Sequence, residues 1–90
     1  MPEITCIGIL VADLVGGSLV AYPSKGKLVT VENMGLYNGG CATNTGIALA
    51  RLGIETQVLG MVGSDGLGDF LINLLKREGV DIQGLSLIHI

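Results

Sequence analysis

The residues richest in possible chemistry form the segment NGGCATNT, residues 38–45. Gly39 and Gly40 carry no Cβ, so a ligand can approach their backbone closely and the chain can adopt positive φ there. The residues that follow predict a helix, whose first turn exposes N–H groups and the positive end of its dipole. Asn44 lies on that turn, and its amide can both donate to and accept from a hydroxyl. The segment therefore predicts a site for a polar ligand.

Asp13 is a second candidate for binding such a ligand. The preceding run Ile4–Val11 is apolar, β-branched and without clear alternation, which predicts a strand buried on both faces of a parallel sheet. Ligands of open α/β sheets bind at the carboxyl ends of the strands, where Asp13 is expected. Its carboxylate can accept hydrogen bonds from substrate hydroxyls, or it can serve as a turn or cap.

The same choice stays open for the other candidates. Gly39 and Gly40 can admit a ligand or act as a hinge, but they can also form a tight turn between a strand and a helix. Asn44 can bind a sugar hydroxyl, or it can be a capping or packed amide. Gly63, Asp65 and Gly68 are typical of a loop and helix cap.

The hydrophobic pattern predicts the elements that position these residues. They are strands at 4–11 and 56–62, helices at 42–52 and 69–78, and exposed ribbon strands at 19–22 and 28–31. A strand–helix–strand order implies parallel strands joined by a right-handed crossover. The predicted fold class is therefore α/β.

Composition narrows the possible functions. The chain has 90 residues, a net charge of −3 and no basic cluster, which argues against a nucleic-acid or anionic-membrane surface. Cys6 and Cys41 lack metal-site spacing and predict reduced, packed thiols in a cytoplasmic protein, and the N-terminus does not suggest a signal peptide. There is no Walker phosphate loop, dinucleotide fingerprint or Ser-His-Asp arrangement.

The last six residues, LSLIHI at 85–90, stand apart from the rest. A DNA sequence that encodes them resembles a transposase end used to prepare sequencing libraries. We therefore expect a non-native, adapter-derived tail after about Gly84, with an ordinary strand as the alternative. His89, the only histidine, then carries no functional weight.

Taken in order, the motifs resemble the N-terminal part of a ribokinase-like (PfkB family) carbohydrate kinase, over residues 4 to about 84. The resemblance is carried by GGCATN at 39–44, ARLG at 50–53 and GMVGSDGLG at 60–68. It implies a doubly wound α/β domain with a β-ribbon lid at about 14–37. Members transfer the γ-phosphate of ATP, with Mg²⁺, to a sugar hydroxymethyl group.

The resemblance also assigns substrate-binding roles. Asp13 matches an aspartate that binds sugar hydroxyls, Gly39 and Gly40 match the pair at the lid hinge, and Asn44 matches an asparagine that contacts the sugar. Val11 stands where ribose-type members often have a sugar-binding asparagine, which leaves other sugars or a nucleoside open.

The resemblance places the catalytic aspartate and the nucleotide pocket downstream of this chain. We therefore expect the 90-residue chain to be inactive and to bind neither ATP nor Mg²⁺, and the parent enzyme to form a possible homodimer through its lid. Two alternatives remain: a non-catalytic sugar-binding or regulatory member of the same fold, and an unrelated α/β binding domain.

Overall fold

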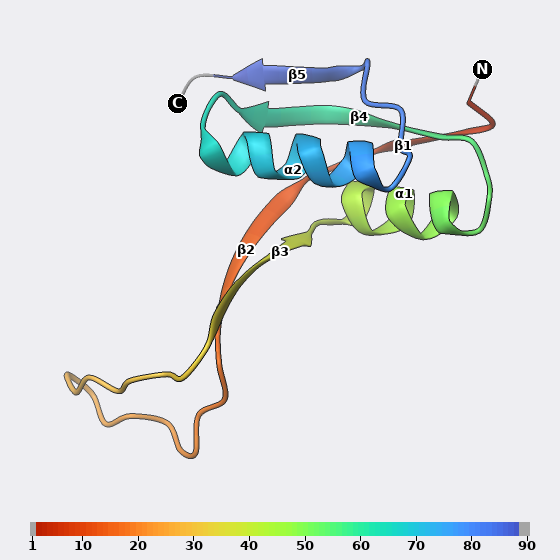
Figure 1. Cartoon of the computed structure of the whole chain (residues 1–90). Helices are drawn as coiled ribbons and strands as arrows, with labels where there is room; N and C mark the ends of the chain where they lie inside the picture. The colour runs from red at the N-terminus through yellow and green to blue at the C-terminus, as the bar shows by residue number, and fades with distance from the viewer. Residues whose placement is uncertain (1, 89–90) are drawn as a thin grey trace.

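The computed structural model describes residues 2–88, which form a parallel sheet with two helices and a separate antiparallel ribbon (Figure 1). The elements in chain order are β1 (Ile4–Ile7), β2 (Val11–Gly16), β3 (Met34–Gly39), α1 (Cys41–Arg51), β4 (Thr56–Gly63), α2 (Gly66–Arg77) and β5 (Leu85–Ile88). The sheet has the order β1-β4-β5, and β2 pairs with β3 in the ribbon. The expected α/β class, with parallel strands joined through helices, is confirmed.

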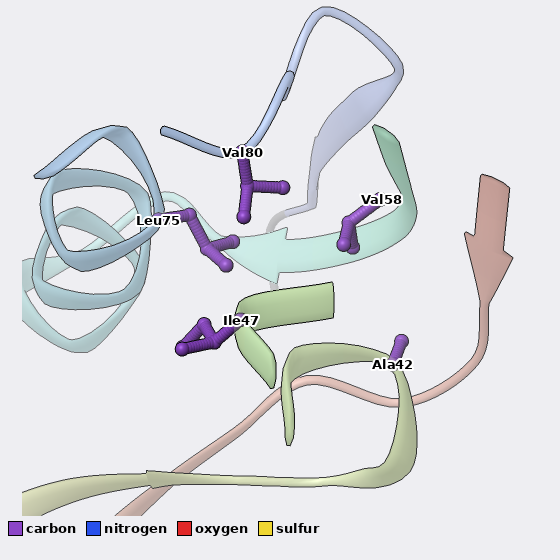
Figure 2. Close-up of a cluster of buried hydrophobic side chains, with 5 residues drawn as sticks. All are labelled: Ala42, Ile47, Val58, Leu75 and Val80. Atoms are coloured by element: carbon purple, nitrogen blue, oxygen red, sulfur yellow. The ribbon is translucent and has the colours of Figure 1, made fainter. Parts of the chain in front are cut away.

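The core lies between the two helices and one face of β4. Along β4 the buried residues Thr56, Val58 and Val62 alternate with the more accessible Leu59 and Met61. Val58 packs in one cluster with Ile47 of α1 and Leu75 of α2 (Figure 2). Complete burial of an aliphatic side chain of this size contributes about 1.5–3 kcal/mol. Both helices therefore cover the same face of the sheet.

The first predicted strand is wrong in length and in burial. The run 4–11 is divided into β1, a short link at residues 8–10 and the start of β2. The side chains of β1 are mostly exposed, and Ile7 keeps 76% of its surface accessible. β1 is an edge strand of the described sheet, and the described helices cover one sheet face, so the other face of β1 is left uncovered. Asp13 consequently lies within β2 and does not follow the end of a buried strand.

The ribbon strands also differ from their predicted positions. The structure pairs residues 11–16 with residues 34–39, whereas segments 19–22 and 28–31 form no strand. The backbone N–H of Gly17 donates to the carbonyl of Asn33, next to the last strand pair. Beyond this point Val20, Tyr22 and Leu28 are almost fully exposed, so neither a partner strand nor a packed face holds this segment in extended pairing. The ribbon projects away from the sheet (Figure 1).

The helices agree more closely with the sequence. α1 is displaced by one residue from the predicted 42–52. α2 begins at Gly66 rather than Asp69, because Asp65 caps it: an Asp65 carboxylate oxygen accepts from the N–H of Gly68 at 2.9 Å. A Cβ on Gly68 would collide with the carbonyl oxygen of Gly63, so this close first turn requires a glycine. Both helices end before glycines of positive φ, Gly53 and Gly79.

An ion pair joins the C-terminal ends of the two helices. The Arg51 guanidinium donates to both carboxylate oxygens of Glu78, at 2.8 and 2.5 Å. The hydrogen bond to Arg51 lowers the pKa of Glu78, and the same contact raises the pKa of Arg51. The pair is exposed on the arginine side, so it links the helix ends at the surface and lies outside the core.

Residues 85–88 form β5, which pairs in parallel with Gly60–Gly63 of β4. Residues 89 and 90, including His89, lie outside the described residues. A short apolar segment of this composition pairs readily with a sheet edge whatever its origin, so the adapter-derived tail stays a prediction.

Candidate functional site

The four predicted site residues lie where the ribbon joins the start of α1. Asp13 is on β2, Gly39 is the last residue of β3, Gly40 is the N-cap of α1 and Asn44 lies in the first turn of that helix. The structure therefore collects residues from two separate parts of the sequence around one strand-to-helix junction.

Gly40 makes this sharp junction possible. Its φ is 90°, in the region that side chains rarely adopt, and a Cβ there would lie 2.5 Å from the carbonyl oxygen of Ile9. That carbonyl accepts a hydrogen bond of 3.2 Å from the N–H of Ala42, and the carbonyl of Gly40 accepts one of 3.0 Å from the N–H of Asn44. The first turn of α1 thus rests directly on the link between β1 and β2.

Gly39 allows the carboxylate of Asp13 to lie close against the backbone of β3. A Cβ on Gly39 would lie 2.5 Å from one carboxylate oxygen of Asp13, closer than real contacts permit. The backbone at Gly39 is buried, whereas Asp13 is exposed. One carboxylate oxygen of Asp13 therefore lies close to Gly39, and the side chain remains accessible to solvent.

Asn44 has a side-chain partner that sequence reasoning missed. The Nδ2 of Asn38 donates to the Oδ1 of Asn44 at 3.0 Å. Asn38 is half-buried on β3, next to the glycine pair, and Asn44 is exposed on the helix. The signal in the sequence was a second asparagine six residues before Asn44, at the opposite end of the same motif.

The ribbon register places Asp13 and Asn38 on opposite faces of the ribbon. Asp13 lies opposite Tyr37 and Val11 lies opposite Gly39, so these four share one face of the ribbon. Asn38 lies opposite Ala12, on the other face. The side chains of Asp13 and Asn44 accordingly contact different partners, Gly39 and Asn38. Their convergence on one ligand stays a prediction.

An open groove of about 480 Å³ runs beside the asparagine pair along α1. It is lined by Asn38, Asn44, Ile47, Ala48, Arg51 and Leu52. Its polar lining residues are the two asparagines and Arg51, and its apolar ones are Ile47, Ala48 and Leu52. Such a surface fits a small molecule that carries both hydroxyl groups and apolar C–H groups.

Residues 1–89 match the pfkB family of carbohydrate kinases. The chain belongs to this family. The resemblance seen in the sequence motifs is confirmed. The family assignment covers the ribbon, the glycine pair and both helices.

Curated relatives of this PfkB chain include sugar kinases. It is 32% identical over 82 residues to a putative sugar kinase of Pyrococcus horikoshii, covering 91% of this chain and 24% of the relative. It is 39% identical over 55 residues to a 5-dehydro-2-deoxygluconokinase of Clostridium perfringens, covering 61% of this chain and 16% of the relative. The chain thus spans about a quarter or less of the length of these relatives.

Solved structures confirm the ribokinase-like fold of the PfkB chain. An Arabidopsis thaliana ribokinase complexed with ribose and ATP superposes with a TM-score of 0.84 at 21% identity, covering 98% of this chain and 28% of that one. The Pyrococcus horikoshii sugar kinase in complex with ATP gives a TM-score of 0.75 at 32% identity, with 94% and 26% covered.

Two further structural features concern the cysteines and the helices of the PfkB chain. Cys6 and Cys41 are free thiols, but the prediction that both are packed is wrong for Cys41, which is exposed at the start of α1, whereas Cys6 is half-buried. Between residues 2 and 88, neither helix has the length and hydropathy needed to cross a membrane.

Proposed function

We propose that this chain is the N-terminal portion, residues 1–84, of a cytoplasmic ATP-dependent sugar kinase and supplies part of its sugar site. The observation that carries the proposal is the junction of ribbon and helix. There the Asp13 carboxylate lies close to Gly39, and Asn44 lies on the first turn of α1. Carboxylate and amide groups suit the binding of a polyol, because they accept from and donate to hydroxyls. The names of the reported relatives support a sugar as the substrate class.

We assign the catalytic step to the part of the parent protein beyond this chain. Residues 2–88 bring together no group of Asp, Glu, His or Cys side chains that could hold a metal ion. We place Mg²⁺, ATP and the catalytic base in the remainder of the parent protein, as the family resemblance implies. The role that we assign to this chain is to bind and orient the sugar. The segment at about 14–37, which includes most of the ribbon, acts as a lid that excludes water.

The proposal is tested with Asp13→Ala and Asn44→Ala in the full-length protein. Loss of a hydrogen bond to a charged group costs about 1.5–3 kcal/mol, so Asp13→Ala is expected to lower kcat/KM for the sugar roughly 10- to 150-fold. Asn44→Ala is expected to lower it less, since its amide is neutral. Coupled ADP release against a panel of sugars and nucleosides measures both, and KM for ATP should stay unchanged.

Two outcomes separate the proposal from its alternatives. Sugar binding without ADP release by the wild-type protein would favour the non-catalytic sugar-binding or regulatory member. Unchanged sugar affinity in both folded variants would favour an unrelated role for this α/β scaffold. Retention of the wild-type thermal midpoint shows that either variant is folded, and Asn73→Ala, on the exposed side of α2, is the matched control.

A further inference from the structure

The hydrogen bond between Asn38 and Asn44 is a feature that the proposed function does not use. It joins the second-to-last residue of β3 to the first turn of α1, across the glycine pair. Asn44 is exposed, so packing alone leaves its side chain free to rotate. Asn38 is half-buried and held within the ribbon pairing opposite Ala12, which makes it the more rigid partner.

The direction of this hydrogen bond decides what Asn44 offers to a ligand. A side-chain amide has one acceptor oxygen and two donor hydrogens on nitrogen. The oxygen of Asn44 accepts from Asn38 at 3.0 Å, so its NH₂ group remains to donate elsewhere. The N–H groups of Ala42 and Asn44 in this turn already donate to the backbone carbonyls of Ile9 and Gly40. The side-chain NH₂ group of Asn44 is therefore a donor that the junction presents to a ligand oxygen.

We propose that Asn38 is a positioning residue that holds the Asn44 amide with its NH₂ group toward the sugar. This rests on the proposed function and adds a residue to it. The recognised ligand atom is an oxygen that accepts a hydrogen bond, either a carbonyl or a hydroxyl oxygen of the substrate. The proposal explains how an exposed amide next to an open groove is held in one orientation.

The position of Gly39 and Gly40 between the two asparagines strengthens the coupling. The turn at Gly40 brings Asn44 back toward the end of β3, with the Asn44 N–H bonded to the Gly40 carbonyl at 3.0 Å. Backbone and side chain of Asn44 are thus both tied to the segment 38–40.

The test is a double-mutant cycle in the full-length protein, with sugar binding measured by calorimetry and turnover by ADP release. Asn38→Ala is expected to weaken sugar binding about two- to tenfold, the range of one neutral hydrogen bond, with KM for ATP and kcat unchanged. In the Asn44→Ala background, Asn38→Ala is expected to have no further effect, because a positioning residue acts only through its partner.

Two more variants exclude a merely structural role. Asn38→Gln retains the donating amide and is expected to restore most of the sugar affinity, whereas Asn73→Ala, an exposed asparagine of α2, should change nothing. Equal losses from Asn38→Ala in both backgrounds, or no loss in either, would overturn the inference. The proposed function is judged separately, by whether the wild-type protein turns over any sugar at all.

Discussion

At the scale of single residues, Gly39 and Gly40 have different structural roles in the same motif. Gly40 provides a backbone conformation, since its φ of 90° turns the chain from ribbon to helix. Gly39 provides space, since its missing Cβ leaves room for the Asp13 carboxylate. Replacement of the two residues should consequently fail in different ways.

Gly39→Ala is expected to displace the Asp13 side chain while leaving the fold largely intact. The new methyl group would lie 2.5 Å from a carboxylate oxygen, and an exposed carboxylate can rotate away. We expect KM for the sugar to rise at least about tenfold, the scale of a lost charged hydrogen bond, with a small change in thermal midpoint. Steady-state kinetics with sugar varied at saturating ATP measures this.

Gly40→Ala is the matched comparison for that experiment. Its methyl group would collide with backbone atoms of Ile9 and would require a strained φ, so it is expected to lower the thermal midpoint markedly. A Gly39→Ala protein that lost stability as severely as Gly40→Ala would contradict the separate roles of the two residues.

The site could be predicted in part at this scale. The glycine pair and Asn44 stand out because residue types that favour turns and polar contacts immediately precede a helix pattern. Asn38 could not be identified, because its role depends on the turn at Gly40 that brings residues 38 and 44 together. The proximity of Asp13 to Gly39 depends on ribbon register, which apolar runs specify poorly.

At the scale of elements, prediction succeeded where local periodicity decides the structure. α1, α2 and β4 follow from helical or buried-strand patterns with caps at their ends. The ribbon strands were not predicted correctly, because β1 and the start of β2 form one apolar run in the sequence. Segments 19–22 and 28–31 have strand propensity, but they pair with no strand among the described residues. Pairing over distance, rather than propensity, determines these strands.

The Arg51–Glu78 pair gives an element-scale prediction. The lowered pKa of Glu78 means that the pair stabilises the fold above the ordinary glutamate pKa, about 4.3, and is lost as the pH falls through the lowered value. Arg51→Met in the full-length protein should therefore lower the thermal midpoint slightly at pH 7, and this difference should shrink as the pH falls through the lowered pKa of Glu78.

Differential scanning fluorimetry across this pH range measures the effect. Lys76→Met, which removes a positive charge from the last turn of α2, controls for net charge at the helix ends. A difference between wild type and Arg51→Met that persisted unchanged at low pH would show that Arg51 does not stabilise the fold through its ion pair with Glu78.

At the scale of the whole molecule, the described residues leave large apolar areas uncovered. Met61 on β4, Ile7 on β1 and Val20 beyond the ribbon are all exposed, at 61%, 76% and 108% of their reference surfaces. Both described helices cover the same sheet face, so the other face of β4 and the edges at β1 and β5 are open. In a doubly wound sheet these surfaces are covered by further strands and helices.

The 90-residue chain on its own is therefore expected to self-associate and to phosphorylate no sugar. Open sheet edges and exposed apolar faces favour intermolecular pairing. Sedimentation velocity and ADP release measure the two expectations, with residues 1–84 as a matched version that lacks the predicted tail. A monomeric preparation with a single cooperative melting transition would contradict the first expectation, and sugar-dependent ADP release would contradict the second.

The order of the strands has a consequence for synthesis on the ribosome. β1 pairs with β4, which lies 52 residues later in the chain, whereas β2, β3 and α1 are all made in between. The sheet therefore cannot begin until β4 has left the exit tunnel, and closing so long a loop is slow relative to forming a ribbon or a helix. The nascent chain must carry β1 unpaired through that interval, so the strand made first is among the last to be protected.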